Sequence, residues 1–450
     1  MTISSEQYDN GELLASAPEG PALPLKIGAR IDRPRLADNI VSLYILQGLN
    51  YAIPMAVLPY LVRVLGMESY GLLAFAQSFA QYFTILTDYG FNFSATRSIA
   101  QQRKDGSTVS RIFSSVLVVK VSLMCLGALL LAGIIFTVPR IHHHAEFFFV
   151  AYLAVIGNVL FPVWYFQGMQ KMRQITIIIG TCRLLGAGAL FVFVHHPKDA
   201  LLALAIQSFA LAASGAIGLP IAFRNSGLRL LWPSWADLRV TLAEGWHLFV
   251  STAAISLYTN TNVFLVGILA GSTQAGYFSA AEKLVRAVHG LLLPASQAFF
   301  PHASSLVSQS REAALRFTSR ILGWMGAIAL FSSLVLFVFA RPIILFCLGP
   351  GGAGSVAVIR WVALLPFFAA VSNVLGVQTM VLFGLDKQFS RILIFAGVFN
   401  VALAIPLIRA FYAQGAGASV LCTECLIPLL MFMVLRRHKI PIFRIEGTSS

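Results

Sequence analysis

Long apolar segments recur along nearly the whole chain, and they constrain the fold more than any motif does. A helix needs about 20 mainly apolar residues to cross the hydrocarbon core of a bilayer. Twelve such segments follow one another: 39–62, 71–94, 112–137, 146–167, 174–194, 200–222, 246–270, 276–300, 317–340, 355–383, 388–408 and 414–435. Only 11% of the residues are charged, whereas soluble domains have about 25%. The alternation typical of barrel strands is also missing. The sequence therefore predicts an all-α, polytopic membrane protein with about twelve transmembrane helices.

The charges outside these segments are distributed asymmetrically. The first 35 or so residues are polar, do not resemble a signal peptide, and are predicted to be a disordered tail. If the N-terminus is cytoplasmic, the inner loops and tails hold 22 Lys and Arg residues. The outer loops then hold five, namely Arg63, Arg140, Lys198, Arg341 and Arg409. This bias is the positive-inside rule, and it predicts that both termini are cytoplasmic. The net charge of +14 is thereby explained by topology and contact with membrane lipids, so no nucleic-acid partner is expected.

Two stretches of the chain resemble each other. "YLVRVLGMESYGLLAFAQSF" begins at Tyr60 and "FLVGILAGSTQAGYFSAAEKL" begins at Phe264, and Gly71 of the first aligns with Gly276 of the second. Two pseudo-symmetric six-helix bundles are typical of transporters with a central site between them. The predicted divisions are a cytoplasmic tail, the N-terminal bundle, a basic linker, the C-terminal bundle and a second cytoplasmic tail: 1–35, 36–223, 224–244, 245–436 and 437–450. The Trp-rich linker has the composition of an amphipathic helix on the cytoplasmic surface.

Several charged residues lie inside the predicted spans. The cations are Lys120, Arg183, Lys283, Arg286 and Arg360, and the acids are Asp88, Glu282 and Glu424. A Lys, Arg or Asp at the centre of a span costs about 2.5–3.5 kcal/mol, so such residues normally face a water-filled cavity or a partner. Arg360 and Asp88 lie near span ends, where a long side chain can reach the headgroups.

One span, around Glu282, carries most of this charge. Lys283, Arg286 and His289 follow one another at intervals of three residues and share a helix face. This spacing predicts an anion site. The alternative is structural, because Glu282 and Arg286 are four residues apart and can pair on the same helix.

Amide and aromatic side chains on other spans predict a sugar-lining wall or, alternatively, hydrogen bonds between helices. They are Gln47, Asn50, Gln77, Gln81, Tyr258, Asn260 and Asn262, with Asn373 and Gln378 as further polar residues. No phosphate-binding loop or hydrolase motif occurs, and the three histidines at 142–144 lie in a short loop. Neither a cofactor, nor a metal, nor an enzymatic activity is predicted.

Four segments resemble one known family. They are "PYLVRVLGMESYGLLAFAQSFAQYF" (Pro59–Phe83), "FPVWYFQGMQKMRQITI" (Phe161–Ile177), "LYTNTNVFLVGIL" (Leu257–Leu269) and "GYFSAAEKLVRAV…P…FFPHAS" (Gly276–Ser304). They are similar to the bacterial polysaccharide flippases of the Wzx type, in the multidrug/oligosaccharidyl-lipid/polysaccharide exporter superfamily. Gln170 replaces the acid that often follows the "FQG" motif in that family.

The resemblance implies a function. Family members move oligosaccharide units linked by pyrophosphate to a polyprenyl lipid from the inner to the outer leaflet of the bacterial inner membrane, by alternating access, for surface polysaccharide such as lipopolysaccharide or exopolysaccharide. Lys283 and Arg286 are then predicted to bind the pyrophosphate, with Arg183, Lys120 and His289 assisting. Glu424 and Asp88 are candidates for coupling to H⁺ or Na⁺. A polysaccharide polymerase is a candidate partner.

Two other functions stay open at this point. An ion-coupled multidrug antiporter of the same superfamily would favour acids in its cavity, whereas mid-span cations outnumber acids here. A membrane glycosyltransferase or polymerase would need a long outer loop for its catalytic residues, and none is predicted.

Overall fold

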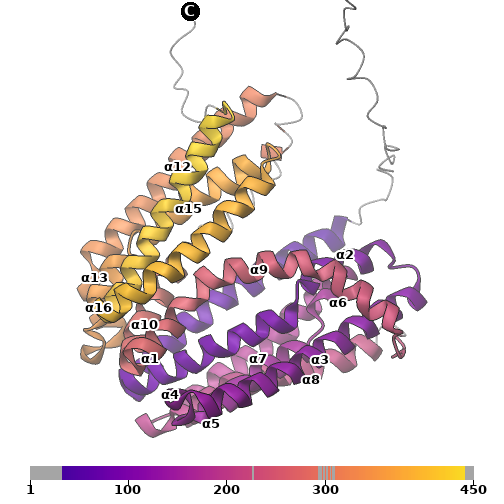
Figure 1. Ribbon diagram of the computed structural model, residues 1–450, viewed down its shortest axis with the longest axis horizontal. Helices are drawn as coiled ribbons and strands as arrows, with labels where there is room; N and C mark the ends of the chain where they lie inside the picture. The colour runs from indigo at the N-terminus through magenta and orange to yellow at the C-terminus, as the bar shows by residue number, and fades with distance from the viewer. Residues whose placement is uncertain are drawn as a thin grey trace, which may run out of the picture.

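The computed structural model describes residues 33–224, 228–291, 296, 299, 303–304, 306 and 310–440. The side chains of residues 33–43, 247, 251, 254–255 and 257–258 also lie outside this description. Within the described residues every element is a helix (Figure 1). In chain order the helices are α1 (Arg33–Asp88), α2 (Phe91–Gln101), α3 (Gly106–Thr137), α4 (Pro139–His142), α5 (Ala145–Leu160), α6 (Val163–Gly168), α7 (Met172–Phe193), η1 (Pro197–Asp199), α8 (Ala200–Arg224), α9 (Trp235–Ala270), α10 (Ser272–Gly290), α12 (Arg311–Val338), α13 (Ala340–Leu348), η2 (Pro350–Gly352), α14 (Ser355–Val362), α15 (Leu365–Leu375), η3 (Gly376–Val381) and α16 (Asp386–Arg437).

The two longest helices are each two helices joined by a tight turn. Gly66 in α1 has φ 76° and ψ 166°, a backbone conformation that glycine adopts readily. In α16 the turn lies at Tyr412, with φ 54° and ψ −131°, and Gly415 packs against the carbonyl of Leu407 just before it. Each helix therefore accounts for two predicted spans, and the turns fall in the predicted gaps at 63–70 and 409–413.

Three predicted spans are broken rather than continuous. The span predicted at 71–94 leaves α1 at Asp88 and resumes in α2 at Phe91, across Tyr89 and Gly90, which both have positive φ. The span predicted at 146–167 is α5 and α6, which are separated at Phe161 and Pro162; Phe161 is extended, with φ −87° and ψ 105°, because the residue before a proline avoids the helical region. The span predicted at 355–383 is divided into α14, α15 and the π-helix η3. Pro366 lies in the first turn of α15, where a proline is tolerated.

Eight helical segments in the described residues are long and apolar enough to cross a membrane. α1 and α16 each count once among them although each turns back on itself, and α10 is excluded by its own charges. The prediction of an all-helical polytopic membrane protein is confirmed, and the number twelve stays a prediction.

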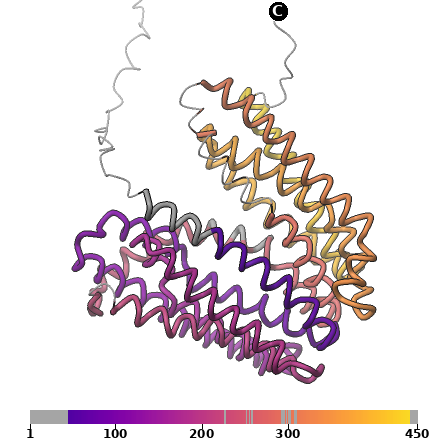
Figure 2. Tube along the Cα trace, turned by 180° about the vertical axis from the view of Figure 1, so that it is seen from behind, coloured from indigo at the N-terminus to yellow at the C-terminus, as the bar shows by residue number. Residues whose placement is uncertain are grey.

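The helices form two groups that diverge like the arms of a V (Figures 1 and 2). The first group, drawn indigo to magenta, contains α1 to α8; the second, drawn orange to yellow, contains α12 to α16; α9 and α10 lie between them. The start of α1 and the end of α16 lie at the open end of the V. We call the opposite end, where the groups meet, the closed end.

Packing and two arginines hold the closed end together. The largest apolar cluster contains Leu65 and Phe75 of α1 together with Val266 of α9 and Phe278 of α10, so it crosses from one group to the other. Arg63 donates a hydrogen bond to the carbonyl of Phe346 in the last turn of α13. Arg140 donates to the carbonyl of Ile268 in the last turn of α9, at 2.6 Å. The carbonyls that end a helix lack intrahelical partners and carry partial negative charge, so both arginines satisfy them.

The predicted linker 224–244 is largely the beginning of a long helix. α9 starts at Trp235 with a capping box formed by Ser234 and Asp237, and it continues to Ala270 without interruption. Ahead of it, the backbone amides of Arg229 and Leu231 donate to the hydroxyls of Ser110 and Ser114 in α3, at 3.2 and 2.9 Å. The connection is therefore fixed along the N-terminal group.

Candidate functional site

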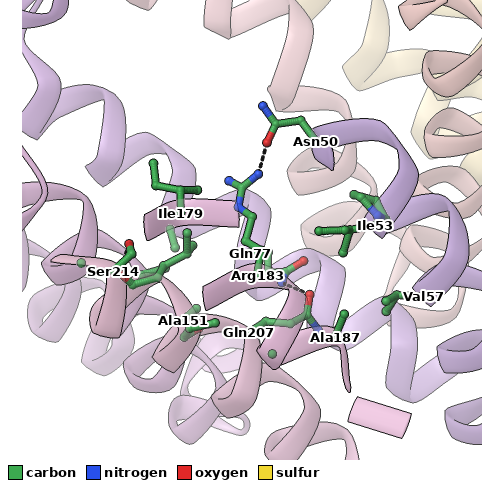
Figure 3. Close-up of a pocket in the computed structure, with 18 of the residues that line it drawn as sticks. Asn50, Ile53, Val57, Gln77, Ala151, Ile179, Arg183, Ala187, Gln207 and Ser214 are labelled. Atoms are coloured by element: carbon green, nitrogen blue, oxygen red, sulfur yellow. Dashed lines mark hydrogen bonds between the residues drawn. The ribbon is translucent and has the colours of Figure 1, made fainter. Parts of the chain in front are cut away.

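A cavity of about 660 Å³ lies inside the N-terminal group (Figure 3). Its walls come mainly from α1, on both sides of the Gly66 turn, and from α5, α7 and α8. One residue, Lys283, comes from α10. Its polar and charged lining residues are Asn50, Tyr70, Gln77, Gln81, Thr84, Asn158, Arg183, Gln207, Ser208, Ser214 and Lys283.

Arg183 enters the cavity from the middle of α7. It is half-buried, and its guanidinium donates a hydrogen bond to the amide oxygen of Asn50 on α1 (Figure 3). On the neighbouring wall, the amide of Gln77 donates to that of Gln207, at 3.1 Å (Figure 3). Arg183 is therefore oriented by a neutral group and keeps its full charge and its remaining N–H donors for a ligand.

Lys283 is the only described contribution of α10 to the cavity wall. Its Nζ lies 3.0 Å from the hydroxyl of Tyr70 and 5.2 Å from the centroid of the Tyr70 ring, which is a cation–π distance. Tyr70 belongs to the part of α1 that follows the Gly66 turn, and its side chain is buried. The two cavity cations thus come from α7 of the first group and from α10, which lies between the groups, and both line the same cavity.

The described lining of the cavity contains two cations and no carboxylate. Amides and hydroxyls supply the other polar atoms. Charges interact far more strongly in such a partly buried site than in bulk water. The cavity is therefore built to attract an anion, and its amides can hydrogen-bond hydroxyl groups.

Lys120 and Asp88 form a buried ion pair beside the cavity. Lys120 Nζ lies 3.0 Å from Asp88 Oδ1, and the two side chains are 2% and 24% exposed. Asn158, which lines the cavity, donates to the same carboxylate oxygen at 2.8 Å. Lys120 therefore reaches the cavity only through Asp88 and Asn158.

The predicted stripe on α10 is divided between two environments. Lys283 faces the cavity, whereas Arg286 pairs with Glu282 at 2.8 Å and donates to the carbonyl of Thr259 in α9. His289 of the same helix and Glu424 of α16 are both half-buried. The pairing of Arg286 with Glu282 is thus present, and of the three residues on this face Lys283 alone lines the cavity.

The predicted amide wall is likewise divided. Asn50, Gln77 and Gln81 line the cavity, whereas Gln47 and Asn260 are half-buried and not among its lining residues. Asn262 is buried and donates to the amide oxygen of Asn400 at 3.1 Å, which is a contact between α9 and α16. The side chain of Tyr258 lies outside the described residues.

This cavity lies within the N-terminal group, whereas the sequence predicted a central site between the halves. Three lining residues that matter were missed, namely Tyr70, Asn158 and Gln207. The last two are amides inside apolar spans, so the rule that selected Gln77 could have found them; nothing in the sequence singles out Tyr70. Among the described residues, no group of three or more His, Cys, Asp or Glu could hold a metal ion.

Sequence comparisons place the chain in a family. A family described as "Polysaccharide biosynthesis protein" matches residues 36–307. A protein of Escherichia coli (strain K12) named "Putative O-antigen transporter" is 35% identical over 405 residues, which are 90% of this chain and 98% of that protein. A protein of the same name from Shigella dysenteriae is 31% identical over 411 residues, covering 89% and 100%.

Solved structures share the fold. A multidrug resistance MATE family transporter in an inward-facing conformation superposes with a TM-score of 0.68 at 13% identity, covering 91% of this chain and all of that one. The lipid II flippase MurJ in an inward closed conformation superposes with a TM-score of 0.66 at 10% identity, covering 89% and 87%. An outward-facing MATE family structure scores 0.52 at 15% identity, covering 90% and 96%.

The family match covers more than half of the chain, and the two O-antigen transporters match nearly all of it. The resemblance seen in the sequence motifs is thereby confirmed. The chain belongs to the polysaccharide biosynthesis protein family and is a multi-pass membrane transporter rather than an enzyme.

Proposed function

We propose that this chain is a flippase of the bacterial inner membrane that moves polyprenyl-pyrophosphate-linked oligosaccharide units from the inner to the outer leaflet. The observation that carries the proposal is the cavity that both Arg183 and Lys283 line, with no carboxylate among its described lining residues. Arg and Lys are suited to binding phosphate groups. The amides of Asn50, Gln77 and Gln81 are suited to binding sugar hydroxyls.

The membrane arrangement that we propose has twelve crossings in two pseudo-symmetric halves, at 36–223 and 245–436. Both termini, residues 1–35 and 437–450, are cytoplasmic, as the 22 basic residues of the inner loops and tails favour. The open end of the V then faces the cytoplasm. The higher TM-score to the inward-facing structure than to the outward-facing one, 0.68 against 0.52, supports this assignment.

In this state the lipid-linked anion enters from the inner leaflet. Its pyrophosphate lies between Arg183 and Lys283, its sugars lie along the amide wall, and its polyprenyl chain remains in the lipid. An export step that carries two negative charges out of an inside-negative cell gains about 2.3 kcal/mol per charge per 100 mV. Asp88 and Glu424 remain our candidates for H⁺ or Na⁺ coupling. Arg286 and His289 are supporting cations, and Lys120 supports the site through its ion pair with Asp88.

Reconstituted protein can test this function. The full chain in proteoliposomes is given a fluorescent polyprenyl-pyrophosphate oligosaccharide, and its movement between leaflets is followed by quenching from one side. We expect wild type to flip the lipid, and Arg183→Gln and Lys283→Gln each to lower the rate about tenfold or more, because a hydrogen bond to a charged group contributes about 1.5–3 kcal/mol.

Two comparisons make this experiment specific. Arg360→Gln is the matched control, since Arg360 is an exposed cation on α14 that does not line the cavity, and it should leave the rate unchanged. Arg286→Gln should have less effect than Lys283→Gln, because Arg286 is held by Glu282. Full flipping by both cavity variants would refute the site, and export of a cationic dye without lipid flipping would favour a multidrug antiporter.

A further inference from the structure

The closed end is built around two glycines that occupy the same position of the internal repeat. Gly71 of α1 and Gly276 of α10 pack so closely that a Cβ on Gly276 would lie 3.2 Å from the Cα of Gly71. A Cβ on Gly71 would overlap the carbonyl of Ser272, and a Cβ on Gly276 would overlap the carbonyl of Met67. Met67 and Ser272 each precede their glycine by four residues, so the contact is pseudo-two-fold symmetric. It holds α1 and α10 together at the level of the backbone, at the end where the two groups meet.

A second contact joins α1 and α10, between Tyr70 and Lys283. Tyr70 is the residue before Gly71, and its hydroxyl binds Lys283 Nζ at 3.0 Å. Lys283 is seven residues beyond Gly276, about 10.5 Å along α10. The Tyr70–Lys283 contact therefore joins α1 and α10 at a second place, on the cavity wall.

Lys283 is held there by a weak partner. In the described part of the chain no carboxylate forms an ion pair with it, and its contacts are the hydroxyl and ring of Tyr70. The Tyr70 contact pairs the ammonium ion with a neutral group, whereas a diphosphate offers it an opposite charge, which attracts it more strongly in a partly buried site. A diphosphate in the cavity would therefore displace the phenol from Lys283.

We propose that Tyr70 is a positioning residue that couples the anion to the closed end: in the empty transporter it holds Lys283 and stabilises the contact between α1 and α10, and an anion releases both. This inference rests on the proposed function for the identity of the anion. When the anion binds Lys283, the contact between Lys283 and Tyr70 is lost. Loss of this contact favours separation of α1 from α10 at the closed end. The anion thus promotes the opening of the opposite side, as alternating access requires.

The inference makes an unusual prediction for Tyr70→Phe. The variant keeps the ring and loses the hydroxyl, so Lys283 no longer has to leave a hydrogen bond before it binds the anion. A ligand binds more weakly when only a fraction of the protein is in the binding-competent conformation. A substitution that increases this fraction therefore strengthens binding. We expect inorganic pyrophosphate to bind Tyr70→Phe about tenfold more tightly than wild type in calorimetry of the full chain in nanodiscs.

Opening of the closed end is measured in the same samples. Spin labels at His143→Cys and Gly351→Cys, with the five natural cysteines replaced by Ala, report the distance between the two groups. Both sites are exposed, and a Cβ at Gly351 meets no atom within 4 Å. Wild type should move toward longer distances when pyrophosphate is added, and Tyr70→Phe should show more of the long-distance population without it.

Tyr60→Phe is the matched control. The Tyr60 hydroxyl donates to the carbonyl of Val194 at 2.6 Å, within the N-terminal group, so neither binding nor distance should change. Weaker or unchanged pyrophosphate binding in Tyr70→Phe overturns the inference, as do an unchanged distance distribution and an equal response in Tyr60→Phe. A wild type that flips the lipid while Tyr70→Phe changes nothing keeps the proposed function and removes this inference. If wild type flips no lipid while Tyr70→Phe opens the closed end, the inference is kept and the proposed function is rejected.

Discussion

At the scale of single residues, the buried cations differ in what balances their charge. Lys120 has a carboxylate partner in Asp88, which also receives a hydrogen bond from Asn158. Lys283 and Arg183 have neutral partners, Tyr70 and Asn50. A buried charge without an opposite charge is costly, and that cost can be recovered by an anionic ligand. We therefore regard the first cation as structural and the other two as the binding pair.

The Lys120–Asp88 pair can be tested by its effect on stability. Removing one member of a buried ion pair leaves the other charge uncompensated and costs about 3–5 kcal/mol. We expect Lys120→Met and Asp88→Asn each to lower the melting temperature of detergent-solubilised protein, and the double variant to recover much of the loss. The measurement is thermal unfolding followed by intrinsic fluorescence.

A different outcome would assign Asp88 to ion coupling. If Asp88→Asn unfolds at the wild-type temperature but no longer responds to a pH or Na⁺ gradient in the flipping assay, the coupling prediction is supported and the structural interpretation is wrong.

At the scale of elements, apolar length predicted where helices lie, whereas local backbone chemistry decided how they are divided. The turns at Gly66 and Tyr412 fall between predicted spans because short polar or small-residue stretches already separate the apolar segments there. The breaks at Pro162 and Pro366 lie inside predicted spans, because the apolar pattern continues across a proline that interrupts the helix. The π-helix at Gly376–Val381 has no periodic signal, so the sequence could not predict it.

The start of α3 is set by a cap with a pH-dependent effect. Asp105 accepts hydrogen bonds from the amides and hydroxyls of Ser107 and Thr108. The Thr108 and Ser107 side chains are the main cause that lowers the pKa of Asp105 from 3.8 to about 2. Because the folded-state pKa is depressed, the stabilisation is present above pH 3.8 and is lost as the pH falls toward about 2.

Asp105→Ala should therefore unfold at a lower temperature than wild type at neutral pH, and the difference should shrink across that acidic window. Ser310→Ala is the control, because Ser310 caps α12 with a neutral hydroxyl at 3.3 Å from the amide of Ala313. Its effect should not depend on pH in this range, and a pH-independent effect of Asp105→Ala would contradict the assignment.

The crossing of α1 and α10 depends on the absence of side chains at two positions. Gly71→Ala places a methyl group against the Ser272 carbonyl, and overpacking of this kind costs about 1–3 kcal/mol. We expect a lower unfolding free energy, measured in a denaturant titration, and a larger separation of spin labels at the closed end. Gly188→Ala meets no atom within 4 Å, so it should leave both unchanged; a stable, closed Gly71→Ala variant would show that the backbones can separate without consequence.

At the scale of the whole molecule, the V shape gives the membrane orientation its functional meaning. The start of α1 and the end of α16 lie at the open end (Figure 1), so the side on which the termini lie decides which leaflet the cavity faces. The sequence predicted two groups of helices from a repeat at Tyr60 and Phe264. It did not predict that the cavity lies within one group, because that depends on how Tyr70, Arg183 and Gln207 meet across helices far apart in the sequence.

The orientation is tested by labelling from each side. In a background without natural cysteines, His143→Cys at the closed end should react with an impermeant maleimide added to intact cells from outside. Lys104→Cys, an exposed site beside the start of α3, should react only after the inner membrane is permeabilised. The reverse pattern would place the cavity on the outer side and contradict the proposed direction of loading.

The contact of Gly71 with Gly276 has the form of an isologous interface, in which the same patch meets its own copy across a two-fold axis. A half-length chain with one such glycine would form the same contact by dimerising. Met67 and Ser272 occupy equivalent positions, so a single residue of that shorter chain would take the place of both. Joining two such copies in one chain would then allow them to diverge. In this chain the divergence shows in Tyr70 and its repeat counterpart Ala275, of which only Tyr70 carries a hydroxyl to bind Lys283. The asymmetry that makes a directional transporter would thus have arisen beside the point where the ancestral symmetry is best preserved.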